Sequence, residues 1–229
     1  MIMRGHFQLN KLIKNYSPKE IAVAGVKEIY RKIYLEKIKN SFSQNGEDLL
    51  IEKYFPKNFK GKYLEIGAYH PVRLSNTYRF YKKGWRGKVV EPNPDIEHYF
   101  KKIRPKDIYI KAGVGNKKGT LNYYHFFIPA LNTFSKIEAE KLIEEGHGLE
   151  KITKINILGV RKIVNFKIDF LSIDTEGFDN QIIKSWPWEK TKPQVICIEK
   201  ISRQNIKMLE NKGYQLREKT PANLIFVRF

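Results

Sequence analysis

The middle of the chain alternates short runs rich in β-branched and aromatic residues with polar stretches of helical spacing. Over roughly residues 41–200 this alternation is typical of βα units, which build a parallel sheet. Several runs are apolar at nearly every position, as expected for strands that helices cover on both faces. The expected strands are Lys62–Ile66, Lys88–Val90, Ile108–Ala112, Phe170–Ile173 and Val195–Ile198. The chain is therefore predicted to be an α/β protein.

The chain beyond residue 200 follows a different pattern. A helix is expected near Ile206–Asn211, ending before Gly213. Two strand-like segments follow, Tyr214–Arg217 and Leu224–Arg228, with a turn at Thr220–Asn223 between them, so we predict an antiparallel hairpin that closes the sheet. The other expected elements are helices at Asn45–Tyr54, Thr77–Lys83, Asp95–Lys102, Ser135–Glu145 and Asp179–Ser185, and an additional strand at Thr120–Phe126.

Residues 1–40 form a separate, basic zone with nine Lys or Arg and three Glu, a net charge of +6. Ser17-Pro18 is a suitable helix start, because proline at the first helical position loses no hydrogen bond. Apolar residues then recur along one helical face: Ala22, Val26, Ile29, Tyr30, Ile33 and Tyr34. We predict an amphipathic helical extension that packs on the domain or on a second copy in a homodimer. A basic helix on a membrane surface stays open as an alternative. Residues 41–229 are predicted to form one domain.

The composition narrows the choice of partners and compartment. With 43 Lys and Arg against 24 Asp and Glu, the net charge is +19, which favours anionic partners without choosing among them. The single cysteine, Cys197, excludes an internal disulfide, and its apolar neighbours predict a buried thiol. No apolar run approaches the ~20 residues of a membrane span, and no signal peptide is evident. We expect a cytoplasmic protein, with peripheral membrane contact through residues 1–40 left open.

The first candidate site is Tyr63–Ala68, where a strand leads into Glu65 and then Gly67. A strand end of this kind lies at the carboxyl edge of the sheet, where open α/β folds bind ligands. The glycine permits close approach of the backbone to a ligand. Because His70-Pro71 stands where further glycines of a dinucleotide motif would be, the sequence argues against a diphosphate cradle. A purely structural turn explains the same residues equally well.

The second candidate is Glu91, which follows Gly67 by 24 residues and directly follows the strand Lys88–Val90. From this position a carboxylate can accept hydrogen bonds from both hydroxyls of a ribose. Pro92 and Pro94 fix the loop, and Asn93 offers an amide beside it. A ribose site without a diphosphate loop points to an adenosyl ligand that carries an amino acid, and S-adenosylmethionine fits that description. A capped helix start after Pro94 is the alternative.

The third candidate is the acidic loop at Asp174–Gly177, which a buried strand precedes. Its two carboxylates, Asp174 and Glu176, suit binding of a hydroxyl, acceptance of a proton or coordination of a hard cation. Glu199, at the end of the next strand, would complete a cation site. Helix capping in this loop stays open as an alternative.

Together with three further segments, these motifs resemble the FkbM-type methyltransferases over about residues 41–228. The resemblance rests on six segments in the family's order: Ser43–Asp48, Tyr63–Ala68, Ser75-Asn76-Thr77, Tyr81–Gly87, Glu91–Pro94 and Phe170–Gly177. It implies a class I Rossmann-like methyltransferase fold with a mostly parallel seven-stranded sheet. It also implies that S-adenosylmethionine is the cofactor and that hydroxyls of sugars or of polyketide-type products are methylated.

The resemblance also predicts the binding residues. The predicted cofactor-binding residues are Gln44, Glu65, Ile66, Gly67, Ala68, Asn76, Glu91, Pro92, Asn93, Ala112, Gly113, Val114 and Asp174. The resemblance assigns Glu65, Gly67 and Ala68 to the methionine moiety, Glu91 and Asn93 to the ribose, and Ala112–Val114 to the adenine edge. Ser43, Gln44, Glu47 and Asp48 would close the pocket over the cofactor. Glu65 stands where the family more often has Asp.

Methyl transfer to a hydroxyl needs a group that accepts the hydroxyl proton. The candidate catalytic residues are Glu176, which we prefer, Asp174, which would orient the donor or substrate, and His70. A divalent cation held by Asp174, Glu176 and Glu199 is an open alternative.

The expected function is O-methylation of a sugar or glycan, such as a surface polysaccharide or a nucleotide- or lipid-linked sugar. The net charge favours an anionic acceptor, and the basic residues expected around the mouth of the site are Arg73, Arg79, Lys82, Lys83 and Arg86. A nucleic-acid methyltransferase and a non-catalytic basic adapter at a membrane are the alternatives. The Asn/Asp-Pro-Pro-Tyr signature of base-methylating enzymes is missing, so a nucleic-acid partner is not expected.

Overall fold

The structure is a computed structural model that describes residues 39–175, 177–199 and 201–229, with a few isolated residues before position 39. The helical extension predicted for residues 1–40 therefore lies outside the described residues, as does Glu176. Among the described helices, none is long and apolar enough to cross a membrane.

In the described part of the chain, seven strands form a main sheet in the order β3-β2-β1-β7-β8-β10-β9. Their bounds are β1 Lys62–Ile66, β2 Arg86–Val90, β3 Ile108–Ile110, β7 Phe170–Ile173, β8 Val195–Glu199, β9 Tyr214–Lys219 and β10 Asn223–Arg228. The pairs among β3, β2, β1, β7 and β8 are parallel, whereas β10 runs antiparallel to both β8 and β9. The predicted α/β class with a mostly parallel seven-stranded sheet and an antiparallel C-terminal hairpin is confirmed.

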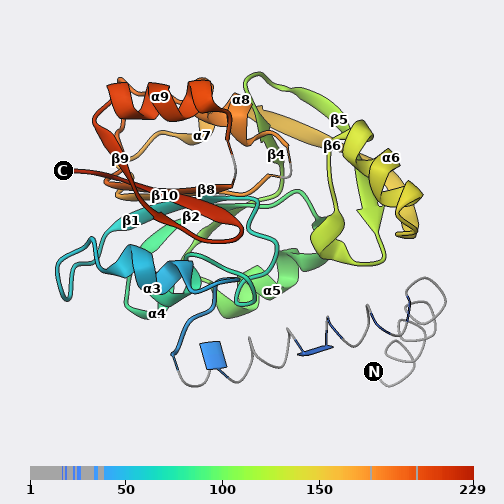
Figure 1. The fold of residues 1–229 in the computed structure, drawn as a ribbon, viewed down its shortest axis with the longest axis horizontal. Helices are drawn as coiled ribbons and strands as arrows, with labels where there is room; N and C mark the ends of the chain where they lie inside the picture. The colour runs from blue at the N-terminus through green and yellow to red at the C-terminus, as the bar shows by residue number, and fades with distance from the viewer. Residues whose placement is uncertain are drawn as a thin grey trace.

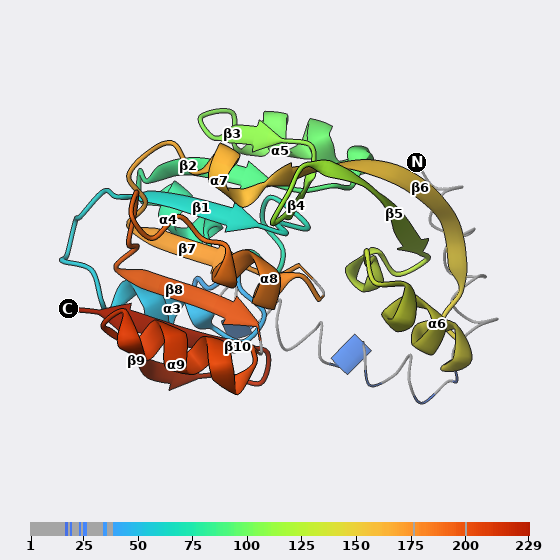
Figure 2. The ribbon, with the colours of Figure 1, turned by 90° about the horizontal axis from the view of Figure 1, so that it is seen from above.

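The chain winds outward from the centre of this sheet in both directions. It passes from β1 to β2 and β3 on one side and later from β7 to β8 on the other, so β1 and β7 are the central neighbours. In such doubly wound sheets, ligands bind at the carboxyl ends of the strands where the winding direction changes. Figure 2 shows the arrows of β1, β7 and β8 pointing toward that edge.

Helices cover both faces of the main sheet, as Figure 1 shows. One layer is α3 Glu47–Glu52, α4 Tyr78–Lys82 and α5 Glu97–Ile103, and the other is α7 Val160–Ile163, α8 Asp179–Lys184 and α9 Arg203–Asn211. Side chains alternate along a strand, so consecutive residues serve different layers. Tyr63 packs in one core cluster with Phe80 and Cys197, whereas Leu64 packs in the other with Ile182. The buried thiol predicted for Cys197 is confirmed.

A second, smaller sheet extends from the main one as an arm. It contains β4 Gly113–Gly115, β5 Gly119–Phe126 and β6 Leu149–Gly159. The 3-10 helix Pro129–Leu131 and α6 Lys136–Glu144 connect β5 to β6. Figure 2 shows β5 and β6 as a curved ribbon with α6 beside it. The strand expected at Thr120–Phe126 and the helix at Ser135–Glu145 are present, but β6 was not predicted. Along β6, the more buried residues Thr153, Ile155 and Ile157 alternate with the exposed residues Lys154 and Asn156. Because only one face of the strand is apolar, its sequence looks like that of a polar loop.

Several predicted elements are shorter in the structure for local reasons. The strand expected at Ile108–Ala112 ends at Ile110, and β4 begins at Gly113 in the other sheet. There the chain packs tightly on β6, since a Cβ on Gly113 would lie 2.5 Å from Cδ1 of Ile157. The helix expected from Asn45 begins at Glu47, because Gly46 has a left-handed φ of 85°. These differences leave the strand order and the position of the strand ends unchanged.

Candidate active site at the strand ends

A cavity of about 340 Å³ lies at the carboxyl ends of the main-sheet strands, within the size range of small-molecule sites. Most of the predicted cofactor-binding residues line it: Gln44, Ile66, Gly67, Asn76, Glu91, Pro92, Asn93, Ala112, Gly113, Val114 and Asp174. The convergence of the ends of β1, β2 and β7 on one cavity is the arrangement that the sequence led us to expect.

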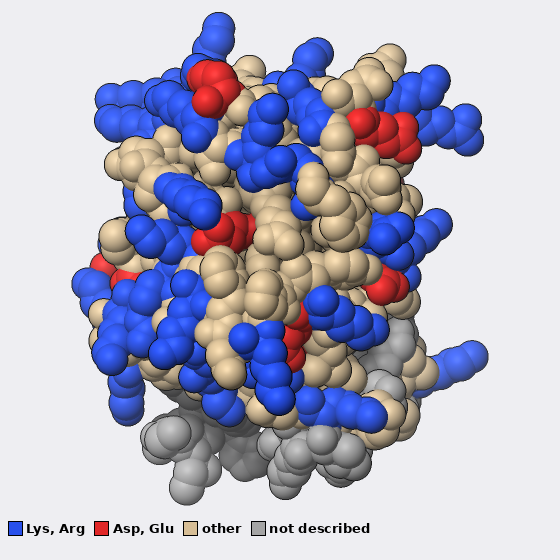
Figure 3. All heavy atoms as spheres, turned by 90° about the vertical axis from the view of Figure 1, so that its left-hand side faces the viewer, with Lys and Arg blue, Asp and Glu red and all other residues tan. Residues whose placement is uncertain are grey.

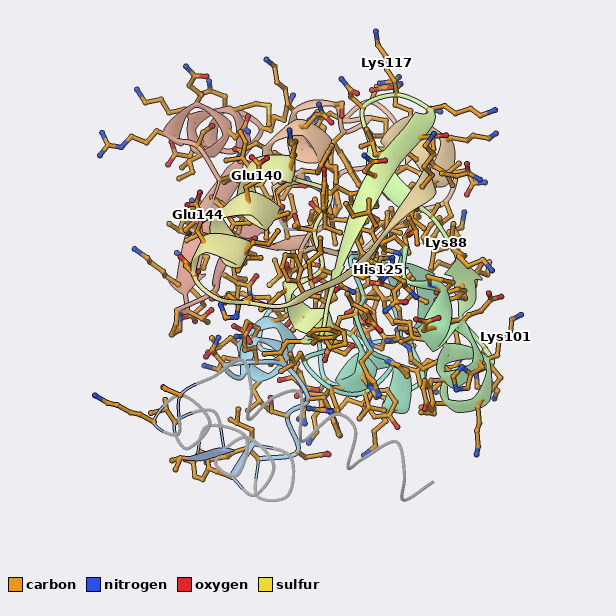
Figure 4. The ribbon with its side chains drawn as sticks, turned by 90° about the vertical axis from the view of Figure 1, so that its right-hand side faces the viewer. Lys88, Lys101, Lys117, His125, Glu140 and Glu144 are labelled. Carbon is orange, nitrogen blue, oxygen red and sulfur yellow. The ribbon has the colours of Figure 1, made fainter. Side chains whose placement is uncertain are left out.

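The arm covers this cavity from the side opposite the strand ends. Tyr123 and Phe134 line the wall that the arm supplies, together with the segment Pro129–Asn132. The ring of His125, labelled in Figure 4, ties the arm together because its Nε2 lies 2.7 Å from Oγ1 of Thr153 on β6. From the sequence, Tyr123 is one of several aromatics that could stack on a sugar, and Asn132 lies in a loop where an acceptor gate is plausible. Phe134 and His125 were not predicted, because nothing in the sequence shows that the arm folds over the motifs.

Gly67 joins the ends of the two central strands. It has a φ of +80°, and a Cβ at this position would lie only 1.6 Å from the carbonyl oxygen of Asp174. The backbone amide of Gly67 donates to the carbonyl of Val90 at 2.9 Å, and that of Asp174 donates to Ile66 at 2.9 Å. Only glycine fits here, so the strand ends meet more closely than any side chain would permit.

Glu91 projects a buried carboxylate at the end of β2, with 4% of its surface exposed. Its two oxygens each accept one backbone hydrogen bond at 2.8 Å, from the amides of Tyr69 and Asn93. Burial raises the pKa of Glu91 to about 7, against the opposing effect of these hydrogen bonds and with a further increase from the charge of Glu65. Since a carboxylate oxygen can accept two hydrogen bonds, each oxygen keeps capacity for a ligand hydroxyl. The side chain of Asn93 is already engaged, because it accepts from the amide of Asp95.

Glu65 does not line the cavity, and the structure gives it a different task from the one the resemblance implies. Its carboxylate accepts hydrogen bonds from Thr77 at 2.5 Å, Ser75 at 3.1 Å and the buried guanidinium of Arg104 at 3.1 Å. The carboxylate thereby holds the loop that carries Asn76. Ala68 also lies off the cavity, in the core beside α4. Arg104 was missed because a lone arginine before a proline gives no sign that it is fully buried.

Ser43, Glu47 and Asp48, expected to close the pocket, support its wall from behind. Asp48 accepts from Ser41 and Ser43, whereas Glu47 accepts from Thr220 at 2.7 Å and Asn223 at 3.2 Å. Of that segment only Gln44 lines the cavity. Asn223 also lines the cavity. It was predicted only as a turn residue, because its partner Glu47 is far from it in the sequence.

The acidic loop contributes Asp174 and Thr175 to the cavity wall, while Glu176 lies outside the described residues. The loop is held by Asp179, whose Oδ2 accepts from Oγ1 of Thr175 at 2.8 Å. No group of three or more His, Cys, Asp or Glu among the described residues is arranged to hold a metal ion. Glu199, the third residue of the expected cation site, does not line the cavity.

His70, the third candidate base, does not line the cavity. Its Nδ1 accepts hydrogen bonds from the backbone amides of Val72 and Arg73, both at 3.0 Å. The ring therefore shapes the loop that follows β1.

No Lys or Arg occurs among the described residues that line the cavity. Of the basic residues expected at its mouth, Arg79 and Lys83 instead form ion pairs with Glu52. The face at the left-hand side of Figure 1, from which the parallel strands point away, is rich in Lys and Arg (Figure 3). In Figure 4, which views the opposite side, Lys101 and Lys117 lie at the periphery.

The comparisons with known proteins identify the family of this chain. A family model described as the methyltransferase FkbM domain matches residues 65–216. Among solved structures, the chain is similar to methyltransferase FkbM from Methylobacillus flagellatus KT, with 14% identity and a TM-score of 0.47 over 73% of this chain and 43% of that chain. It is also similar to a TehB-like SAM-dependent methyltransferase from Corynebacterium glutamicum ATCC 13032 Kitasato, with 10% identity and a TM-score of 0.44 over 90% of this chain and 100% of that chain. The chain thus spans less than half the length of the first of these structures. No curated protein matches the chain.

Proposed function

Because the chain belongs to the FkbM methyltransferase family, we propose that it transfers a methyl group from S-adenosylmethionine to a hydroxyl of a sugar or glycan. Dependence on S-adenosylmethionine comes with the family, whereas the oxygen acceptor and its saccharide nature are the proposal. The observation that carries it is the cavity at the strand ends, where Glu91 and Asp174 line one space from different strands.

The residues at one end of this cavity fit the adenosine part of the cofactor. Among the described residues, the buried carboxylate of Glu91 accepts hydrogen bonds from the backbone amides of Tyr69 and Asn93. Each oxygen keeps one acceptor position, which matches the two donors of a ribose diol. Around it, Val90, Pro92 and Ala112 give the apolar wall that a flat base requires. Gly67 also lines the cavity, so its backbone borders the space for the remainder of the ligand.

When bound, S-adenosylmethionine supplies an electrophilic methyl group on a sulfonium. The protein must hold the acceptor hydroxyl in line with that methyl and take up the hydroxyl proton. Asp174 lines the cavity beside Gly67, and Glu176 follows it by two residues. We propose that this loop supplies the carboxylate that accepts the proton, with Glu176 as the preferred base and Asp174 orienting the hydroxyl.

Titration calorimetry with S-adenosylhomocysteine and with NADH is the first test of this function. We expect S-adenosylhomocysteine to bind and NADH not to bind, since the site lacks a diphosphate loop. Transfer of radiolabelled methyl groups into saccharide fractions, followed by identification of O-methyl sugars by mass spectrometry, then tests the acceptor. Label that appears on nitrogen, or in nucleic acid instead of saccharide, would contradict the proposal.

A further inference from the structure

The cavity has two chemically different ends. We call the part around Glu91, Pro92 and Ala112, at the tips of β2 and β3, the nucleoside end. We call the part around Asn76, Asp174 and Asn223, beside β7, β8 and β10, the amide end. Its defining feature is a pair of buried side-chain oxygens, Oδ1 of Asn76 and Oδ1 of Asn223, which have no hydrogen-bond partner in the described part of the chain. The exposed fractions of these side chains are 6% and 4%, and both residues line the cavity.

The orientation of Asn223 is fixed by Glu47. Nδ2 of Asn223 lies 3.2 Å from Oε1 of Glu47, which also accepts from Thr220 at 2.7 Å. Burial alone would raise the pKa of Glu47, but these hydrogen bonds and one from the backbone of Asn45 hold its pKa below the usual value. An ionised carboxylate only accepts hydrogen bonds. The amide must therefore turn its NH2 group to Glu47, and its oxygen is left without a partner among the described residues.

Asn76 is held in a similar way from the other side. Its Nδ2 lies 3.0 Å from Oγ of Ser172 on β7 and 3.7 Å from the sulfur of Cys197 on β8. Its loop is anchored by the hydrogen bonds of Ser75 and Thr77 to Glu65. Both amides thus direct their donors into the protein and leave an acceptor unused. Leaving a buried acceptor unsatisfied costs about 1–3 kcal/mol, so a ligand that brings hydrogen-bond donors is favoured here.

The position and charge of the amide end indicate what that ligand is. In the main sheet, β7 and β8 stand between β1 and β10, and Asn223 is the first residue of β10. Because neighbouring strands lie about 4.8 Å apart, Asn223 is roughly 14 Å along the sheet edge from the end of β1. Among the described residues lining the cavity there is no cation, and both residues that form carboxylates, Glu91 and Asp174, would repel an anion.

Resting on the proposed function, we infer that the oxygens of Asn76 and Asn223 accept hydrogen bonds from the hydroxyls of an uncharged saccharide ring, which is the methyl acceptor. Glu47 is then a positioning residue, because it acts only through the orientation of Asn223. The Lys and Arg side chains that the structure describes lie outside the cavity, so an acidic group on the acceptor is not recognised at the reacting ring.

The test compares cofactor binding with saccharide binding in the full chain. Protein saturated with S-adenosylhomocysteine is applied to an array of saccharides that end in neutral hexoses, neutral deoxyhexoses or uronic acids. We expect retention by neutral ends, and loss of about tenfold in affinity for the best neutral ligand in Asn223→Leu, as for one hydrogen bond and its buried partner. Glu47→Gln should lose less, about threefold, because the amide of Asn223 is then free to turn over.

The matched control is Asn205→Leu, which removes a buried asparagine that bonds to Asn180 and does not line the cavity. It should leave saccharide affinity unchanged, and thermal melts of all variants check folding.

The same amide oxygens would also suit the ammonium group of the cofactor, so each variant is titrated with S-adenosylhomocysteine and with adenosine. Weakened binding of the first but not the second in Asn223→Leu would overturn the inference. Preference for uronic acids, or retention by no neutral saccharide, would overturn it too. Failure of wild-type protein to bind S-adenosylhomocysteine would instead count against the proposed function.

Discussion

The nucleoside end and the amide end share one cavity but are built in opposite ways. The nucleoside end is made by residues just beyond strand ends: Glu91 directly follows β2, and Ala112 comes two residues after the end of β3. The amide end also takes Asp174 from the end of β7, but its two amides, Asn76 and Asn223, come from segments that are far apart in the chain. The nucleoside end thus depends mainly on the sheet itself, whereas the two amides of the amide end depend on contacts between distant segments of the chain.

The largest effect is expected from Gly67→Ala, because Gly67 lies where the two ends meet. The new Cβ would lie 1.6 Å from the carbonyl oxygen of Asp174, so the ends of β1 and β7 would have to separate. We expect S-adenosylhomocysteine binding to be lost and the melting temperature to fall by about 10 °C or more, as for a destabilisation of roughly 4 kcal/mol.

The control for this substitution is Gly146→Ala. Gly146 has a φ of +89°, close to that of Gly67, but a Cβ there would meet nothing within 4 Å. Backbone strain of about 1–2 kcal/mol should lower its melting temperature by only a few degrees and leave binding intact. Equal effects of the two substitutions would show that the close contact of the strand ends does not matter.

The acids of the loop should affect turnover without affecting the nucleoside end. Glu176→Gln removes the proposed proton acceptor and should lower kcat about 10²–10⁴-fold. The affinity for S-adenosylhomocysteine should stay within a few fold. Steady-state kinetics and calorimetry on the same preparations measure both. If Glu176→Gln leaves kcat unchanged, Glu176 is not the base, and Asp174 becomes the candidate.

How far the sequence predicts this molecule depends on how local the determining contacts are. The central strands and the position of Glu91 follow from patterns within a few residues, and the structure agrees with them. Arg104 and Asn223 could not be found in this way, since their partners Glu65 and Glu47 are distant in sequence. The strand β6 was missed because only one of its faces is covered. The role of Glu65 was misassigned, because a motif gives the residue type at a strand end but not the direction of its side chain.

Glu91→Gln sharpens the difference between the two ends. The amide keeps the shape of the side chain but replaces a charged acceptor, and hydrogen bonds to charged groups contribute about 1.5–3 kcal/mol. Binding of S-adenosylhomocysteine and of adenosine should weaken by the same factor, about 10- to 100-fold. A loss confined to S-adenosylhomocysteine would place Glu91 near the amino acid part of the ligand and contradict the assignment of the nucleoside end.

The raised pKa of Glu91 predicts a dependence on pH near neutrality. Below its pKa of about 7, the protonated carboxyl loses acceptor capacity, so the affinity for adenosine should increase about three- to tenfold as the pH rises from 6 to 8. The stability of the free protein changes in the opposite direction. Because the folded state holds the proton up to about 7 while the unfolded carboxyl releases it near 4.5, stability falls by about 3 kcal/mol as pH rises through that window. Glu91→Gln should remove both trends, and equal slopes in wild type and variant would exclude Glu91 as their source.

The smallest effect is expected from salt, and it separates the cavity from the basic surface. A protein that contacts about 6–10 phosphates of a nucleic acid loses about 10³–10⁵ in affinity for it between 50 and 200 mM salt. The net charge of +19 favours nucleic-acid binding by the basic surface in Figure 3. The cavity differs, because no Lys or Arg among the described residues lines it. The KM for a neutral saccharide should therefore change by less than about twofold over the same range, because such a ligand releases no counterions. Turnover measured at both salt concentrations checks this directly. A steep salt dependence of KM would mean that the acceptor is held by the basic surface. The difference between the amide end and the basic exterior would then no longer explain acceptor choice.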